Sequence, residues 1–202
     1  IKMLGGRNIT VNNFQVRNWN RDSAYTAIYI EPTATNVMLT DLHIDAAYNG
    51  ITGRGLNTTA TSSDVTIKDS KFSNCTVAVD LSCDNVGGSA YILNNVFIQG
   101  CTFYNNTENI VIKRCSEVKI SDNIIVGKTV GDKWAIILNT TQNVSVFKNL
   151  IEKTDKGVYL INSIGALVQR NDFVNLAEST VGIDAGGNTN MEWMNNAYPR
   201  IT

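Results

Sequence analysis

The sequence contains few prolines, which interrupt regular secondary structure, and its net charge is close to zero. It has two prolines and one histidine among 202 residues, and its 17 Lys and Arg nearly balance its 18 Asp and Glu. This balance provides no strong field that would attract nucleic acid or an anionic membrane. Hydrophobic residues make up 43% of the chain, yet no stretch approaches the ~20 consecutive apolar residues of a membrane-spanning helix. We therefore expect neither nucleic-acid binding nor membrane insertion.

The four cysteines, Cys75, Cys83, Cys101 and Cys115, lack the CxxC spacing of zinc sites and redox motifs. The sequence thus predicts no metal and no cofactor. Cys83 and Cys115 fall near each other on consecutive units of the repeat described below. Two alternatives therefore stay open: a disulfide between these two residues, or four reduced thiols. The chain begins at Ile1 without a leader pattern, and we expect one domain over 1–202 that belongs to a longer polypeptide.

A repeat runs through the chain. The segment VKISDNII at 118–125 recurs as VSVFKNLI at 144–151 and ALVQRNDF at 166–173. Weaker copies start at Ile9, Val37, Val65 and Val96. A second motif alternates with these copies: AIYI at 27–30, GITG at 50–53, AVDL at 78–81, NIVI at 109–112, AIIL at 135–138, GVYL at 157–160 and GIDA at 182–185. Repeats of this length are typical of solenoids.

Each unit holds three short strands of period 2, separated by turns rich in Asn, Asp, Thr and Gly, and no helical period is sustained. One unit cannot bury its apolar face alone, but coils that stack at ~4.8 Å and pair in parallel can. The sequence therefore predicts an all-β fold, a single-stranded parallel β-helix of about seven coils with three short parallel sheets.

Stacked coils place like residues in columns. One interior column is predicted to hold Val16, Ile44, Phe72, Phe103, Ile125, Ile151 and Phe173. A turn column beside it ends in Asn123, Asn149 and Asn171, whose amides can bond to one another and to the buried corner backbone. Its earlier members are Cys101, Ser70, Leu42 and Phe14, so we expect the ladder to decay toward the N-terminus.

The VxIxxNxF unit alternating with GIxL resembles the pectate-lyase-like superfamily of right-handed parallel β-helices over about residues 9 to 185. The Asn- and Thr-rich coils and scarce proline are most similar to bacteriophage tailspikes and tail appendages. The resemblance implies a homotrimer on a virion surface or outside the cell. It also implies a polysaccharide lying across the GIxL sheet, among four loops: Trp19 to Thr26, Gly53 to Asp64, Ser82 to Asn95 and Gly127 to Trp134.

Aromatic and acidic residues gather on that sheet. Its outward positions, read from the alternation, are Tyr29, Thr52, Asp80, Val111, Ile137, Tyr159 and Asp184, and just upstream lie Tyr25, Tyr48, Glu108, Trp134 and Asp155. Aromatic rings beside carboxylates suit a sugar polymer. We predict substrate-binding roles for Tyr25, Tyr29, Trp134 and Tyr159. The alternative is that these residues pack against a partner chain.

Glycoside hydrolysis requires two carboxyl groups. Asp80 and Glu108 are the best pair, on adjacent coils and three residues apart along the strand, and Asp155 or Asp184 could replace either. The NTD, DD, GHG and RIK motifs of polygalacturonases and the calcium-binding acidic cluster of pectate lyases are absent, and His43 is expected at the surface.

Two functions stay open. One is a tailspike-like surface protein that binds bacterial polysaccharide and, as a hydrolase or lyase, depolymerises it. The other is a non-catalytic β-helix stalk, adhesin or structural appendage.

Overall fold

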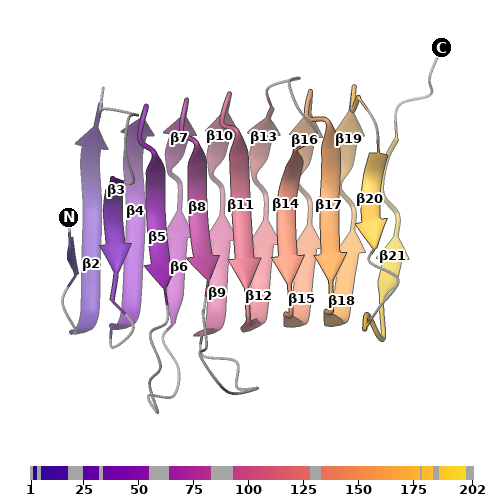
Figure 1. Ribbon diagram of the computed structural model, residues 1–202, viewed down its shortest axis with the longest axis horizontal. Coiled ribbons are helices and arrows are strands. Elements are labelled where there is room, and N and C mark those ends of the chain that lie inside the picture. Colours follow the sequence, from indigo (N-terminus) through magenta and orange to yellow (C-terminus); the bar gives the residue numbers. More distant parts are fainter. Residues whose placement is uncertain are drawn as a thin grey trace.

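The chain folds into a parallel β-helix. The computed structural model describes residues 2–3, 6–17, 25–31, 34–54, 64–82, 93–127, 133–177, 179–183 and 187–198. Its elements are β-strands, and no helix able to cross a membrane occurs in these ranges. In Figure 1 the nearer strands run downward and the more distant ones upward as the chain advances from N to C, which makes the coil right-handed. The predicted fold class is confirmed.

Sheet A contains the GIxL strands. In spatial order its eight strands are β1 (Lys2–Met3), β3 (Thr26–Ile30), β5 (Asn49–Arg54), β8 (Val77–Ser82), β11 (Glu108–Lys113), β14 (Trp134–Asn139), β17 (Lys156–Ile161) and β20 (Ser179–Ile183). Every pair is parallel, and neighbours are one coil apart in the chain.

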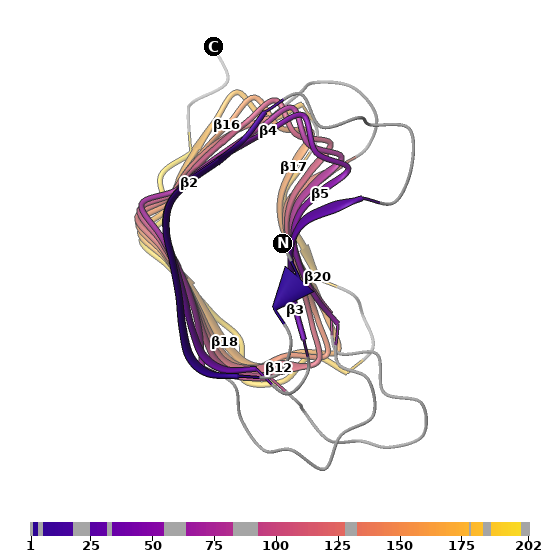
Figure 2. The ribbon, with the colours of Figure 1, turned by 90° about the vertical axis from the view of Figure 1, so that its left-hand side faces the viewer.

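Sheet B has thirteen strands and replaces the two further sheets that the sequence predicted. One part holds β2 (Arg7–Val16), β4 (Thr35–Asp45), β6 (Val65–Lys68), β9 (Leu93–Gln99), β12 (Cys115–Ser121), β15 (Gln142–Phe147), β18 (Ile164–Gln169) and β21 (Glu192–Met194). The other part holds β7 (Lys71–Ser73), β10 (Thr102–Tyr104), β13 (Ile124–Val126), β16 (Leu150–Glu152) and β19 (Asp172–Val174). They are one sheet because β4 continues through the corner and pairs with both β6 and β7. In cross-section the coil still has three sides (Figure 2).

The register agrees with the repeat. Val118 pairs with Val96 and Val144, and Val144 pairs with Ala166, as the aligned copies require. The predicted interior column is formed and is buried along its whole length, from Val16 through Phe72 and Phe103, which stack, to Phe173. Burial of these apolar columns is the main force that holds the coils together.

Turn residues explain why the sequence is rich in asparagine. Twenty-one described non-glycine residues have positive φ, and eleven of them are Asn and three are Asp. These two residue types tolerate the left-handed conformation best after glycine. Their columns mark the points where each coil bends.

The predicted asparagine ladder is present at the corner between the long and short strands of sheet B, which we call the ladder corner. Asn149 Nδ2 donates to Asn171 Oδ1 at 2.9 Å, and Asn123 Nδ2 donates to Asn149 Oδ1 at 2.9 Å. The structure adds Asn196 as a fourth rung, whose Oδ1 accepts from the Asn171 amide at 3.0 Å. The expected decay toward the N-terminus is confirmed: Cys101 takes the next position, and Ser70 Oγ accepts from the Leu42 N–H.

Candidate functional site

The outer face of sheet A begins at a tight bend. From β3 to β17 each strand starts with a half-buried residue, or with the buried Asn49 in β5. The residue that follows is buried and is Ala, Gly or Asn: Ala27, Gly50, Ala78, Asn109, Ala135 and Gly157. At Gly50 a Cβ would lie 2.4 Å from the carbonyl oxygen of Ala78, so nothing larger fits there. Because of this bend, the first and fourth residues of a strand both face outward. Diagonal neighbours on adjacent strands can therefore touch.

Asp80 lies in the predicted column, but its side chain is not directed freely to solvent. The residue is only 9% exposed, and it pairs with Thr52 on one side and Val111 on the other. Ser82 Oγ donates a hydrogen bond to Asp80 Oδ1. The expectation of an exposed carboxylate is therefore wrong, because flanking side chains and Ser82 enclose it.

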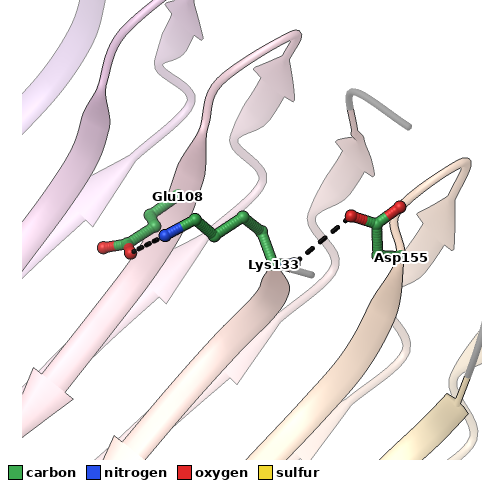
Figure 3. A network of polar contacts seen from close by, with 3 residues as sticks. All are labelled: Glu108, Lys133 and Asp155. Carbon is green, nitrogen blue, oxygen red and sulfur yellow. Dashed lines mark hydrogen bonds and ion pairs between the residues drawn. The ribbon is translucent and has the colours of Figure 1, made fainter. Parts of the chain in front are cut away.

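Glu108 and Asp155 are joined by Lys133. Figure 3 shows Lys133 between the two acids, which come from the preceding and following coils. Lys133 Nζ lies 3.3 Å from Glu108 Oε1, and the Lys133 backbone N–H donates to Asp155 Oδ2 at 3.3 Å. The register sets Glu108 opposite Val77, three residues before Asp80, as the sequence predicted. Glu108 thus has a cationic partner, and Asp155 is buried at 5% exposure.

Trp134 and Tyr159 form an aromatic pair on the same face. Their rings stack with centroids 4.8 Å apart and an interplanar angle of 13°. The Lys156 ammonium lies 5.4 Å from the centre of the Trp134 ring, within cation–π range. In the next strand Tyr159 pairs with Gly182, which carries no side chain. The column of outward side chains is therefore interrupted at Gly182.

The other two predicted aromatic residues lie at the N-terminal end of the face. Tyr29 is half-buried on β3, and Tyr25 is 52% exposed just before that strand. β3 and β14 are separated by four strand spacings in sheet A, roughly 19 Å. Asp80 and Glu108 are on β8 and β11, so the acids lie between the two aromatic groups.

Asp184 lies outside the described residues, and its predicted alignment was wrong. The motif GIDA had been matched with GVYL, which sets Gly182 opposite Gly157. In the structure Val181 pairs with Val158 and Gly182 with Tyr159, a shift of two residues. The four predicted loops also fall largely outside the described ranges.

A small pocket opens where the coil enters β14, at what we call the open corner. The connection from β13 to β14 comprises seven residues, 127–133, whereas three residues make the equivalent connections at 105–107 and 153–155. The pocket has a volume of about 10 Å³, and its walls are Asn106, Thr107, Asn109, Gly127, Lys133, Trp134, Thr154 and Asp155. Sequence reasoning missed Lys133, Thr154 and Lys156, and the length of this connection was the one available signal.

The described cysteines occupy three different corners. Cys75, Cys101 and Cys115 are buried thiols, and each lies 3.3 to 3.4 Å from the backbone oxygen two residues earlier. Burial raises the pKa of Cys101 to about 12. The disulfide that the sequence left open between Cys83 and Cys115 involves Cys83, which lies outside the described residues. His43, on β4, is half-buried and pairs with Lys71.

Comparison with known proteins assigns the repeat to a family. The family described as "Periplasmic copper-binding protein (NosD)" matches residues 6–198, nearly the whole chain. No curated protein and no solved structure matches the chain significantly.

Proposed function

The chain belongs to the NosD family, and from this premise we propose that it is an extracytoplasmic β-helix whose sheet A face binds polysaccharide. The observation that carries the proposal is the Trp134–Tyr159 stack, which is followed on the next strand by Gly182 and not by a third side chain. The apolar face of a pyranose can cover an aromatic ring, while its hydroxyls bond to nearby polar groups. Asn109, Lys133 and Asp155 provide such groups within one pocket.

The contacts of the acids favour binding over cleavage. Glu108 is paired with Lys133, Asp80 with Ser82, and Asp155 with the Lys133 backbone. Each of these three carboxylates therefore has a structural partner without any substrate. We propose a non-catalytic binding domain, and depolymerisation through Asp80 and Glu108 stays a prediction.

The family's name states copper binding, but the described Cys and His residues are not arranged as a copper site. Copper sites in proteins use converging Cys, Met and His side chains. Here the thiols of Cys75, Cys101 and Cys115 lie at separate corners, and His43 lies beside Lys71. Across the described ranges no three His, Cys, Asp or Glu side chains are grouped to hold a metal ion. We do not extend copper binding to this chain.

The "periplasmic" of the family's name supports a location outside the cytoplasm. The tailspike resemblance adds a virion location and a homotrimer, and both stay predictions. Sedimentation equilibrium tests the trimer: a monomer at micromolar concentration would contradict it.

The binding proposal is tested on a glycan array, followed by titration of the strongest hit. Tyr159→Ala should weaken binding about tenfold or more, because a stacked sugar surface is lost. Tyr104→Ala is the matched control, since Tyr104 is 56% exposed on β10, in sheet B. Equal losses in both variants, or no hit at all, would contradict the proposal.

Cleavage is tested on the same glycan by an assay for new reducing ends or unsaturated products. If the wild-type protein releases such products and Asp80→Asn and Glu108→Gln abolish them, the protein is an enzyme. Unchanged polymer length after long incubation would leave it a binding domain.

A further inference from the structure

We propose that the side of the coil formed by the short strands of sheet B binds a second copy of this chain that runs in the opposite direction. This side consists of β7, β10, β13, β16 and β19, and it is the side labelled β16 in Figure 2. We call it the short-strand face. Sheet A forms a different side of the coil, so the inference does not rest on glycan binding.

Two columns of outward side chains cross the short-strand face. Each strand has three residues, and the middle one is buried in the interior column, so the first and third residues face outward. The first column consists of Lys71, Thr102, Ile124, Leu150 and Asp172. The second column consists of Ser73, Tyr104, Val126, Glu152 and Val174.

The centre of the face is apolar. Ile124 is 45% exposed and Tyr104 is 56% exposed, and the neighbouring Val126 and Leu150 are half-buried. The core does not use these side chains, because the interior residues of the same strands point to the opposite side. Apolar side chains grouped on a surface are typical of a protein contact.

The two ends of the first column carry opposite charges. Lys71 lies at the N-terminal end of the column and Asp172 at its C-terminal end, and both are exposed. Neither residue takes part in an ion pair within the described part of the chain. Both charges are therefore available to a partner.

The column of exposed turn residues beside the face carries the opposite order of charges. These residues directly precede the ladder positions, and they are Asp41, Asp69, Gly100, Asp122, Lys148 and Arg170. This column therefore changes from acidic to basic toward the C-terminus, whereas the first column changes from basic to acidic.

An antiparallel copy matches both columns. A two-fold axis that runs along β13 in the contact plane sets β7 of one chain against β19 of the other, because each is two strands from β13. Lys71 then faces Asp172 of the second copy, Asp69 faces Arg170, and each pair occurs twice, as in any isologous contact. Asp122 meets its own copy at the edge of the contact, where Lys148 follows on the next coil.

A parallel copy matches the face less well. A two-fold axis along the coil axis sets the first column against the second, so that Lys71 faces Ser73 and Asp172 faces Val174. No opposite charges then meet along these columns. Because charge complementarity fixes the orientation of a contact, the antiparallel arrangement is favoured.

The size of the face indicates a weak and reversible dimer. Five strands at ~4.8 Å spacing, with three residues and one turn residue each, give an area on the order of 400 Å² per chain. Stable complexes typically bury ~800 Å² per partner. Exposed ion pairs add little and are screened by salt. We expect dimerisation at roughly 100 µM protein, and less of it in high salt.

Sedimentation velocity of the full chain from roughly 10 to 500 µM tests the dimer. The wild type should shift from the mass of one chain to that of two as its concentration rises. Ile124→Arg should weaken the dimer about tenfold or more, because two like charges would meet on the axis. Met38→Arg is the matched control, since Met38 is 47% exposed on the long-strand part of β4. It should dimerise as the wild type does.

A charge exchange tests the antiparallel orientation. Lys71→Asp and Asp172→Lys should each weaken the dimer, because like charges then face each other. The double variant should dimerise as the wild type does, since opposite charges meet again. A merely structural role for these residues would not give this rescue.

Four results would overturn the inference. They are the mass of one chain up to 500 µM, the mass of three chains, unchanged dimerisation in Ile124→Arg, and no rescue in the double variant. None of them bears on glycan binding by sheet A, which is measured for each chain separately.

Discussion

The ladder corner and the open corner are made by the same chain in the same coils, yet they differ in regularity. At the ladder corner, four asparagines bond rung to rung from Asn123 to Asn196, and each amide also reaches a backbone oxygen. At the open corner the spacing changes, because residues 127–133 connect two strands that three residues join in the neighbouring coils. A buried unpaired hydroxyl does not separate the two corners, since Thr154 has one at the open corner and Ser121 has one beside the ladder corner. The difference indicates that the asparagine side chains of the ladder corner serve stability, whereas binding at the open corner is our proposal.

The strongest test of the ladder corner is Asn149→Ala. Asn149 Oδ1 accepts from both the N–H and the amide of Asn123, and Asn149 Nδ2 donates to Ile120 O. Alanine leaves several of these buried groups unpaired, and we expect a loss of about 3 kcal/mol in the free energy of unfolding. Urea denaturation measures it. Asn196→Ala, at the half-buried end of the ladder, should cost about 1 kcal/mol, and equal costs would show that the rungs are independent.

At the open corner, substitution of polar side chains should change the stability of the protein little, whereas a substitution that displaces the backbone should lower it. At Gly127 a Cβ would lie 2.3 Å from Thr154 Cγ2 and 2.7 Å from Thr154 Cα. Gly127→Ala must therefore displace main chain, and we expect a cost of about 2 kcal/mol. At Gly53 the nearest atom would be the movable Leu81 Cδ2 at 3.0 Å, so Gly53→Ala should cost less. A thermal midpoint for Gly127→Ala equal to that of the wild type would show that this corner is loose.

Much of the fold could be predicted because buried apolar residues repeat at fixed places. Six of the seven GIxL copies were aligned in the register that the structure shows. The seventh slipped by two, because TVGI at 180–183 and GIDA at 182–185 both satisfy the motif. Lys133 and Thr154 do not belong to either repeated motif. Their contacts depend on the direction in which each side chain points between neighbouring coils. No alternation in the sequence encodes that direction.

At the ladder corner, the thiol of Cys101 occupies the position that an asparagine amide takes in the later coils. Burial raises its pKa to about 12, while an unfolded thiol ionises near pH 9. The folded state therefore retains the proton that the unfolded state loses. Stability should be unaffected below pH 9 and should fall by about 1.4 kcal/mol per pH unit between pH 9 and about 12. The pH dependence of unfolding in Cys101→Ser should lack this component; identical slopes would contradict it.

The corner between β14 and β15 is an intermediate case, regular in spacing but built with hydroxyls instead of amides. Thr141 Oγ1 and Ser163 Oγ lie 2.8 Å apart there, one coil from each other. The preceding residue, Thr140, has φ of 54°, a conformation that β-branched residues rarely adopt. Thr140→Gly should relieve that strain and keep the backbone hydrogen bond from Thr140 N–H to Ile161 O, which measures 2.7 Å. We expect the free energy of unfolding to rise by about 0.5 to 1 kcal/mol. This is the smallest effect of the four, because glycine also adds freedom to the unfolded chain.

Thr141→Gly is the matched control: it removes the buried, hydrogen-bonded hydroxyl of the adjacent residue and should destabilise the protein. If both changes lower the urea midpoint, side-chain contacts hold the left-handed turns of this solenoid more than backbone preference does. Regular and irregular corners would then differ in side-chain packing and not in backbone conformation.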